Sequence, residues 1–134
     1  MDRKELRQKV FDKTNGFCAY CGRGLDLKGE WAIDHIIAKS RGGKNKLSNY
    51  LPSCHACNIR KYNRTPDEFK EFIKDQIIQK FDSYVSGYIE LMYSFLDAEE
   101  YYKLVQLQIK YLDSIASANI VFEYEKLEIN NGTR

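Results

Sequence analysis

The sequence predicts an α+β fold, in which a small metal-stabilised module is followed by a mostly helical C-terminal extension. Three observations support this. Two C-x2-C pairs enclose a strand-length apolar run, apolar residues recur at helical spacing from residue 66 onward, and the charge divides between the two halves. A chain of 134 residues suits one domain or a small module with an extension. We place the boundary between residues 1–65 and 66–134.

The N-terminal half contains short elements separated by glycine. Residues 3–14 have the apolar spacing of an amphipathic helix. Residues 31–38 form an apolar run between Gly29 and the Gly42-Gly43 pair, which predicts a strand, and Leu25 and Leu27 could supply its hairpin partner. We expect a loop over residues 42–52 and a short helix from His55 through Lys61.

The C-terminal half begins with a strong helix signal. Thr65 can cap the helix, Pro66 takes its first position, and Glu68 completes a capping box. A long helix should follow, with a possible break near Gly87. Asp97 and Glu100 form a second possible capping box, which opens another helix. Alternating apolar residues over 120–124 predict a short strand.

Charge is distributed unevenly along the chain. Residues 1–66 contain 14 basic and 6 acidic side chains, a net charge of +8, whereas residues 67–134 contain 7 and 13, a net charge of −6. This asymmetry predicts a polyanionic partner for the N-terminal half alone. No apolar run approaches the ~18 residues of a membrane span, and the N-terminus is charged where a secretory signal is apolar. We therefore expect a cytoplasmic protein without a membrane partner.

The four cysteines predict a structural zinc site. Cys18 and Cys21 form one C-x2-C pair and Cys54 and Cys57 a second, with 32 residues between the pairs. Two such turns can direct four thiolates at one tetrahedral ion and leave no open position for chemistry. The alternative is a redox pair or four free thiols. A half of about 66 residues needs such a staple to fold, so zinc is the better interpretation.

Asp34 and His35 stand next to each other within the predicted strand, between the two cysteine pairs. Neighbouring residues of a strand point to opposite faces, so both can serve one site only at a strand end or a local distortion. Alone, such a pair is more often a hydrogen-bonded structural pair. Its place inside the cysteine framework favours a functional role.

The order and spacing of these motifs resemble the HNH endonuclease family, whose core is the ββα-metal fold. The match covers about residues 10–65 and corresponds to the subclass with a four-cysteine structural zinc. It comprises the two cysteine pairs, the run Ile33-Asp34-His35-Ile36-Ile37, the segment from Ser40 to Asn49, and Asn58 with Lys61. The chain departs from many members at the last position of the motif, where Asn58 replaces histidine, an HNN variant.

This resemblance implies a metal-dependent endonuclease that hydrolyses phosphodiester bonds in DNA by a one-metal mechanism. A neutral histidine can accept a proton from water near pH 7, which makes His35 the candidate general base. Asp34 and Asn58 offer the oxygen ligands that Mg²⁺ or Mn²⁺ prefers. Asn49 would hold the loop and orient His35 by hydrogen bonding, and Lys61 would contact the scissile or adjacent phosphate.

The basic surface and the acidic extension imply different partners. A basic surface suits contacts with the backbone of DNA, with RNA as the alternative, and its candidate nucleic-acid-binding residues are Arg41, Lys44, Lys46, Arg60 and Arg64. His55, inside the second cysteine pair, is more often solvent-facing, and Trp31 is more often core than a base-stacking platform. The tyrosine-rich acidic half could pack on the nuclease core, form a homodimer or bind a protein partner.

Two rival functions remain open at this point. The first is a non-catalytic zinc module that binds nucleic acid through its basic face. The second is an effector subunit of an antiphage or mobile-element system, silent until a partner binds the acidic helices.

Overall fold

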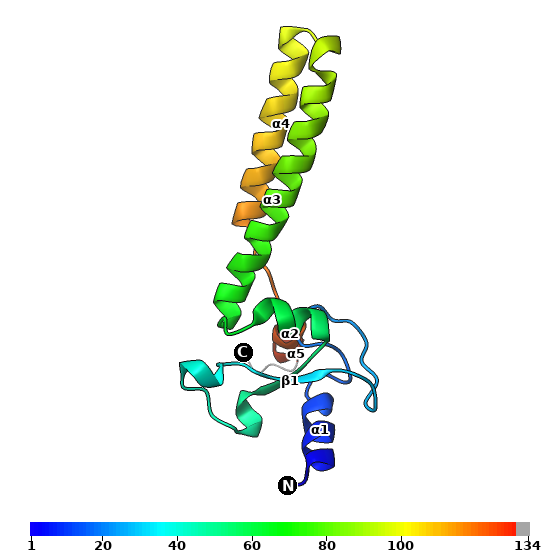
Figure 1. Ribbon diagram of the computed structural model, residues 1–134, viewed down its shortest axis with the longest axis vertical. Helices are drawn as coiled ribbons and strands as arrows, with labels where there is room; N and C mark the ends of the chain where they lie inside the picture. Colours follow the sequence, from blue (N-terminus) through cyan, green and yellow to red (C-terminus); the bar gives the residue numbers. More distant parts are fainter. Residues whose placement is uncertain (131–134) are drawn as a thin grey trace. The chain divides into compact units, whose positions relative to one another are not determined.

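The fold is α+β, as predicted, and a computed structural model describes residues 1–130 (Figure 1). These residues divide into two compact units. The first unit comprises Met1–Phe69 and the segment from Ile120 onward, and the second comprises Lys70–Asn119. Within the described residues, no helix is both long enough and apolar enough to cross a membrane.

The sheet of the first unit has two antiparallel strands, β1 (Ala32–His35) and β2 (Tyr50–Ser53). In their register Asp34 lies opposite Leu51, and His35 lies opposite Tyr50. The predicted partner of β1, at Leu25 and Leu27, is wrong, and the end of the predicted loop over residues 42–52 belongs to β2. Leu25 and Leu27 instead pack against the core beside the sheet.

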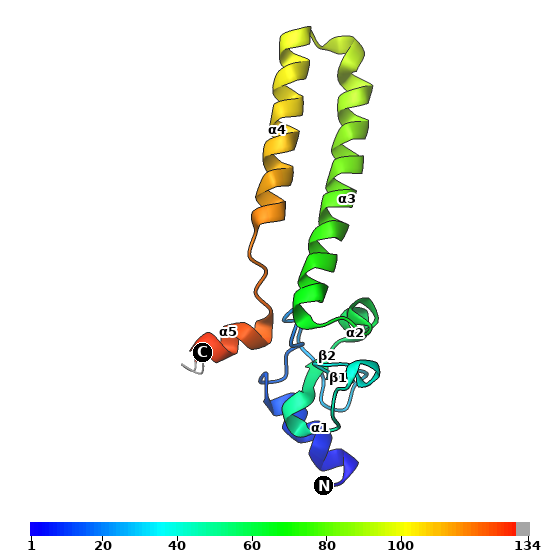
Figure 2. The same cartoon turned by 90° about the vertical axis from the view of Figure 1, so that its left-hand side faces the viewer.

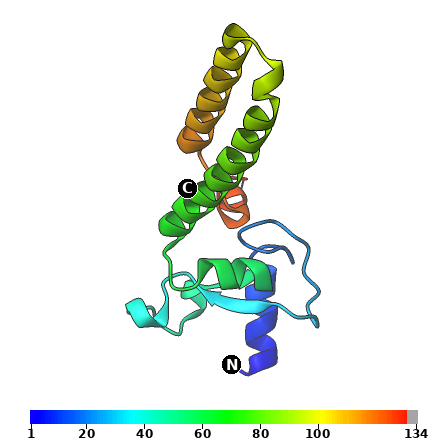
Figure 3. The same ribbon diagram turned by 45° about the horizontal axis from the view of Figure 1, so that its top comes forward.

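Two helices flank this sheet. α1 (Arg3–Asp12) is capped by Asp2, whose carboxylate accepts a hydrogen bond from the Glu5 amide at 2.8 Å. Its buried residue Val10 forms the core with Trp31 and Tyr50, which confirms the core assignment of Trp31. α2 (His55–Lys61) has the predicted bounds and lies along β1 (Figure 3). Short 3-10 turns at Lys39–Arg41 and Leu47–Asn49 shape the loop between the strands.

The segment after residue 119 differs from the sequence expectation. Residues 120–124 do not form a strand, and α5 (Glu123–Asn130) begins among them. Glu125, three residues after Phe122, accepts the Phe122 amide at 2.7 Å, which is half of a capping box and favours a helix start. Phe122 is buried against Tyr20 and Phe69, and the Tyr124 amide donates to the Ala19 carbonyl at 2.9 Å.

This packing places α5 in the cysteine-containing unit, whereas the predicted boundary placed residues 123–130 in the extension. Residues 131–134 of that predicted segment lie outside the described residues.

The second unit is an antiparallel helical hairpin. α3 (Pro66–Met92) and α4 (Ala98–Ser117) run side by side and are joined by a 3-10 turn at Tyr93–Phe95 (Figure 2). α3 continues through Gly87, so the predicted break is absent. Both predicted capping boxes are confirmed: the amide of Glu68 donates to Thr65 at 3.2 Å, and Asp97 and Glu100 cap each other at the start of α4.

Candidate active site and metal centre

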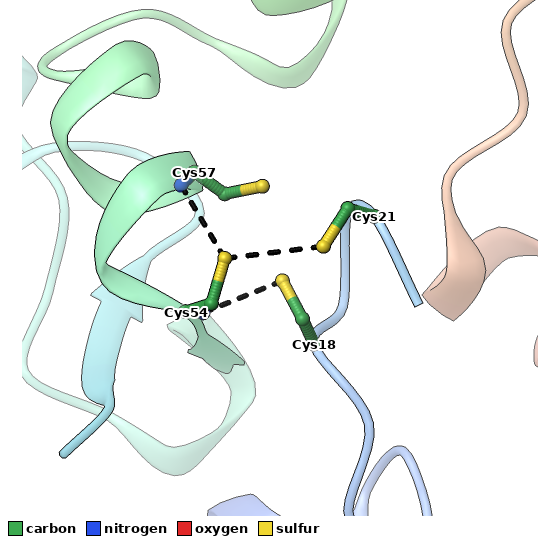
Figure 4. Close-up of side chains that lie close together, drawn as sticks. All are labelled: Cys18, Cys21, Cys54 and Cys57. Carbon is green, nitrogen blue, oxygen red and sulfur yellow. Dashed lines mark hydrogen bonds between the residues drawn. The ribbon is translucent and has the colours of Figure 1, made fainter. Parts of the chain in front are cut away.

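The four cysteines come together from two separate turns of the first unit. Cys18 and Cys21 lie in the turn that the Phe17–Gly24 bridge closes, and Cys54 caps α2, which carries Cys57. Their Sγ atoms lie within 4.8 Å of one another and converge on one point (Figure 4). The sequence prediction that both pairs form a single cluster is confirmed.

The geometry of this cluster fits zinc. Four sulfur ligands at about 2.3 Å from a tetrahedral ion lie roughly 3.8 Å apart, and the Sγ atoms of Cys21 and Cys54 are 3.9 Å apart. A hydrogen bond from Cys57, assisted by the Cys54 amide, lowers the pKa of Cys18 to about 4, and the same bond raises the pKa of Cys57. These shifts favour the thiolate, the form that binds zinc, at Cys18, whereas burial raises the pKa of the Cys21 thiol.

Asp34 is buried on the side of β1 that faces the cysteine turn. Its Oδ2 atom accepts a hydrogen bond from the Tyr20 hydroxyl at 2.5 Å and pairs with the Lys61 ammonium at 3.0 Å. Burial, followed by the charge of Asp34, raises the pKa of Tyr20, so this tyrosine stays a hydrogen-bond donor. Both contacts use Oδ2, so the second carboxylate oxygen takes part in neither.

Lys61 is fully buried, which requires a correction to its predicted role. Its Nζ atom bridges Oδ2 of Asp34 and the backbone carbonyl of His35, the latter at 2.8 Å, and it lies 5.9 Å from the Tyr20 ring centroid. An ammonium with 0% side-chain exposure does not reach a phosphate at the surface. Lys61 instead holds the two neighbouring residues of β1 in place.

His35 points to the opposite side of β1 from Asp34, as the alternation of a strand requires. It is the last residue of the strand and is half-buried. Its Nε2 atom lies 2.9 Å from Oδ1 of Asn45, and its ring meets the Tyr50 ring edge-on with centroids 5.0 Å apart. With the amide oxygen as acceptor, Nε2 carries the proton, and the lone pair of a neutral imidazole is on Nδ1.

Asn49 holds the loop between the strands, and its side-chain hydrogen bonds go to residues other than His35. Its side chain accepts the Ile37 amide at 2.9 Å and donates to the carbonyls of Ile37 and Lys44, both at 3.0 Å. The direct bond to His35 that was expected of Asn49 is made by Asn45, one residue after the Lys44 carbonyl. Asn49 therefore acts on His35 indirectly, by fixing the loop. Gly43 is essential to this loop, since a Cβ there would lie 1.7 Å from the Ile37 carbonyl oxygen.

Asn58 lies on α2, one turn before Lys61, and is half-buried. Residues three apart share one side of a helix. Because Lys61 bonds to Asp34 and to the His35 carbonyl, this is the side of α2 that faces β1. The predicted ligands Asp34 and Asn58 therefore come from facing elements.

Part of the positive charge of the predicted basic surface is neutralised by an acidic side chain. Lys44, Lys46 and Arg60 are exposed. Arg41 pairs with Glu68 at 2.5 Å, and this bond lowers the pKa of Glu68 and raises that of Arg41. Arg64 is half-buried and donates to the Arg60 carbonyl at 2.9 Å. The second histidine, His55, is exposed at the start of α2, as expected.

Sequence reasoning missed two residues that contact the candidate site. Tyr20 stands inside the first cysteine pair, and its polar tip could have been expected to find a buried partner. Asn45 stands between two lysines of the predicted loop, and no motif singles it out.

Comparisons with known proteins agree with this geometry. The HNH endonuclease family model matches residues 18–64, which include both cysteine pairs, β1, β2 and α2. A curated relative, the "SPbeta prophage-derived putative HNH endonuclease YoqL" of Bacillus subtilis (strain 168), is 26% identical, and the match covers 54% of this chain. The chain spans about a third of that relative, 36% of its length. Residues 18–64 are an HNH endonuclease domain, and their four neighbouring cysteines fit the zinc-containing subclass of this family.

Proposed function

We propose that this protein is a metal-dependent endonuclease that hydrolyses phosphodiester bonds in DNA, with His35 as general base and a single catalytic ion. The observation that supports this best is the arrangement at the end of β1. A half-buried histidine held by Asn45 follows a carboxylate whose Oδ2 atom is fixed by Tyr20 and Lys61. The two residues are adjacent in sequence, and their side chains have different partners, which suits an oriented base beside an oriented ligand.

The hydrogen bond of His35 supports its proposed role as the general base. With its proton on Nε2 and directed at Asn45, the imidazole keeps Nδ1 as the acceptor for a proton from water. An imidazole is suited to this task near neutral pH, because its ordinary pKa lies close to 6.5. The edge of Tyr50 restricts rotation of the ring. The structure thus supports a base that is oriented before substrate binds.

Asp34 and Asn58 would hold the catalytic ion, Mg²⁺ or Mn²⁺. Carboxylate and amide oxygens are the ligands that these ions prefer, and such an ion supplies charge neutralisation at the phosphate. Oδ2 of Asp34 already has two partners, which leaves its other oxygen for the ion. Tyr20 and Lys61 are positioning residues in this proposal, since both act through Asp34.

The cysteine cluster would carry zinc with a structural role. All four ligands are protein thiolates, so the site leaves no position for substrate or water. The cluster also connects to the candidate active site, because Tyr20 lies between Cys18 and Cys21 and bonds to Asp34. A reducing compartment such as the cytoplasm would keep the thiols available for the ion.

We propose that three exposed cations contact the DNA backbone: Lys44, Lys46 and Arg60. Arg41 and Arg64 would contribute less, since the structure pairs Arg41 with Glu68 and half-buries Arg64. Contacts of this kind weaken with added salt and depend little on base sequence.

A plasmid-cleavage assay tests the proposed activity. The zinc-loaded protein should nick supercoiled DNA with Mg²⁺ or Mn²⁺ but not with Ca²⁺ or without a divalent ion, and parallel single-stranded DNA and RNA substrates would establish the substrate class. Asp34→Asn should weaken binding of Mn²⁺, measured by calorimetry. A wild-type protein that binds DNA but cleaves none of these substrates would instead support the non-catalytic binding module.

A further inference from the structure

One side of the α3–α4 hairpin carries an apolar groove. The two helices contact each other through the Phe81 and Tyr111 rings, whose centroids are 6.2 Å apart, and through Gln108, which donates hydrogen bonds from α4 to two side chains of α3 at 2.9 Å. Beside this contact lies a groove of about 380 Å³, whose lining includes Phe81, Tyr88, Met92, Leu104, Leu107 and Tyr111. Because residues of both helices contribute, the groove belongs to the hairpin rather than to one helix.

The apolar face extends beyond the groove along α3. Tyr84 and Leu91 border a second hollow together with Tyr88, and the Tyr84 and Tyr88 rings meet with centroids 5.1 Å apart. Ile77 continues the same side of the helix, one turn before Phe81. We call the groove and these three residues the hairpin face.

The area of the hairpin face matches what a stable dimer needs. Eight of its large apolar side chains are between 37% and 70% exposed. At about 200 Å² for a side chain of this size, they offer roughly 800 Å². That exceeds the roughly 300–600 Å² of the largest apolar patch on a typical monomer and equals the roughly 800 Å² that each partner contributes to a standard interface.

We propose that the hairpin face binds the same face of a second copy of this chain, with the two hairpins antiparallel. A self-complementary face forms a closed two-fold dimer. Charge favours the antiparallel direction. Residues 83–106, around the turn, contain four acidic side chains and one lysine, whereas residues 70–82 and 107–119 contain four of each sign.

Parallel hairpins would bring two segments of net charge −3 together, and antiparallel hairpins keep them apart. Lys80, which borders the hairpin face at its end remote from the turn, would then approach the acidic turn of the second copy. This inference does not depend on nuclease activity, although a dimer would also give one proposed cleavage site for each strand of a duplex.

Analytical ultracentrifugation of the full zinc-loaded chain tests the proposal. The wild type should sediment at twice the 15.7 kDa of one chain over the micromolar range. Tyr111→Glu, within the groove, should give a single-chain mass. Tyr102→Glu is the matched control, because Tyr102 is 63% exposed on the same helix, compared with 59% for Tyr111, and lies outside the groove.

Circular dichroism would establish that both variants keep the helical content of the wild type. A dimeric wild type in which only Tyr111→Glu dissociates supports the proposal, and weaker association of Lys80→Glu supports the antiparallel direction. A monomeric wild type, or equal behaviour of the two tyrosine variants, would overturn it. The groove would then be a candidate binding site for a different protein.

Discussion

The buried pair of Lys61 and Asp34 provides a quantitative test of the structure of the first unit. The Lys61 side chain is 0% exposed and that of Asp34 7%, with 3.0 Å between Nζ and Oδ2. Lys61→Met would fill most of the volume but leave a buried carboxylate without its cation. Removal of one partner of a buried pair costs about 3–5 kcal/mol, a large part of the stability of a small domain.

Urea unfolding followed by Trp31 fluorescence measures this loss. Trp31 is the single tryptophan, and it is buried in the core of the first unit, so its emission reports that unit. Lys9→Met is the matched control, because the Lys9–Glu5 pair is about half exposed and should contribute less than about 1 kcal/mol. The double variant Lys61→Met/Asp34→Asn should recover part of the free energy of unfolding that Lys61→Met loses. A Lys61→Met effect as small as that of Lys9→Met would refute the buried pair.

Three further predictions concern the zinc site, Tyr20 and Asn45. Chelation of zinc should shift Trp31 emission to that of an exposed indole while circular dichroism retains the helical signal of residues 70–119; an unchanged emission would contradict a stapling role for the ion. Burial and the charge of Asp34 raise the pKa of Tyr20 above the usual 10.0. The unfolded chain therefore releases this proton first, and the free energy of unfolding should fall as the pH rises above 10. In the Tyr20→Phe variant, the free energy of unfolding should fall less steeply above pH 10 than in the wild type. The same slope in both proteins would argue against the raised pKa of Tyr20. Asn45→Ala should lower kcat by about tenfold with KM little changed, because the His35 imidazole loses one hydrogen bond that orients it. A change in KM alone would count against a role of Asn45 in orienting His35.

Local signals explain what the sequence predicted well. The cysteine spacing, the two capping boxes and the bounds of α2 each depend on residues within a few positions of one another, and the structure confirms them. The four-residue strand β2 was missed because Pro52 argues against a strand, and its buried residues carry no alternating pattern. Its pairing with β1 depends instead on convergence of the two cysteine turns, which brings distant parts of the chain together.

The candidate site was predicted in its residue types more than in its contacts. Asp34, His35 and Asn58 were identified from their motif, but the partners of these residues depend on tertiary packing. A lysine is exposed by default, so the burial of Lys61 beneath the contact of α2 with β1 could not be read from its position. Likewise, Asn45 reaches His35 only because Asn49 and Gly43 fold the loop back.

The most direct test of the proposed activity compares the two histidines of the chain. Both lie in the first unit, but His35 is held at the end of β1 and His55 is exposed at the start of α2. In a plasmid-nicking assay with Mn²⁺, His35→Ala should lose at least about a hundredfold in rate, the usual contribution of a general base. His55→Ala should cleave like the wild type, and both variants should keep the wild-type zinc content. Equal cleavage by His35→Ala and His55→Ala would contradict the role of His35 as the base.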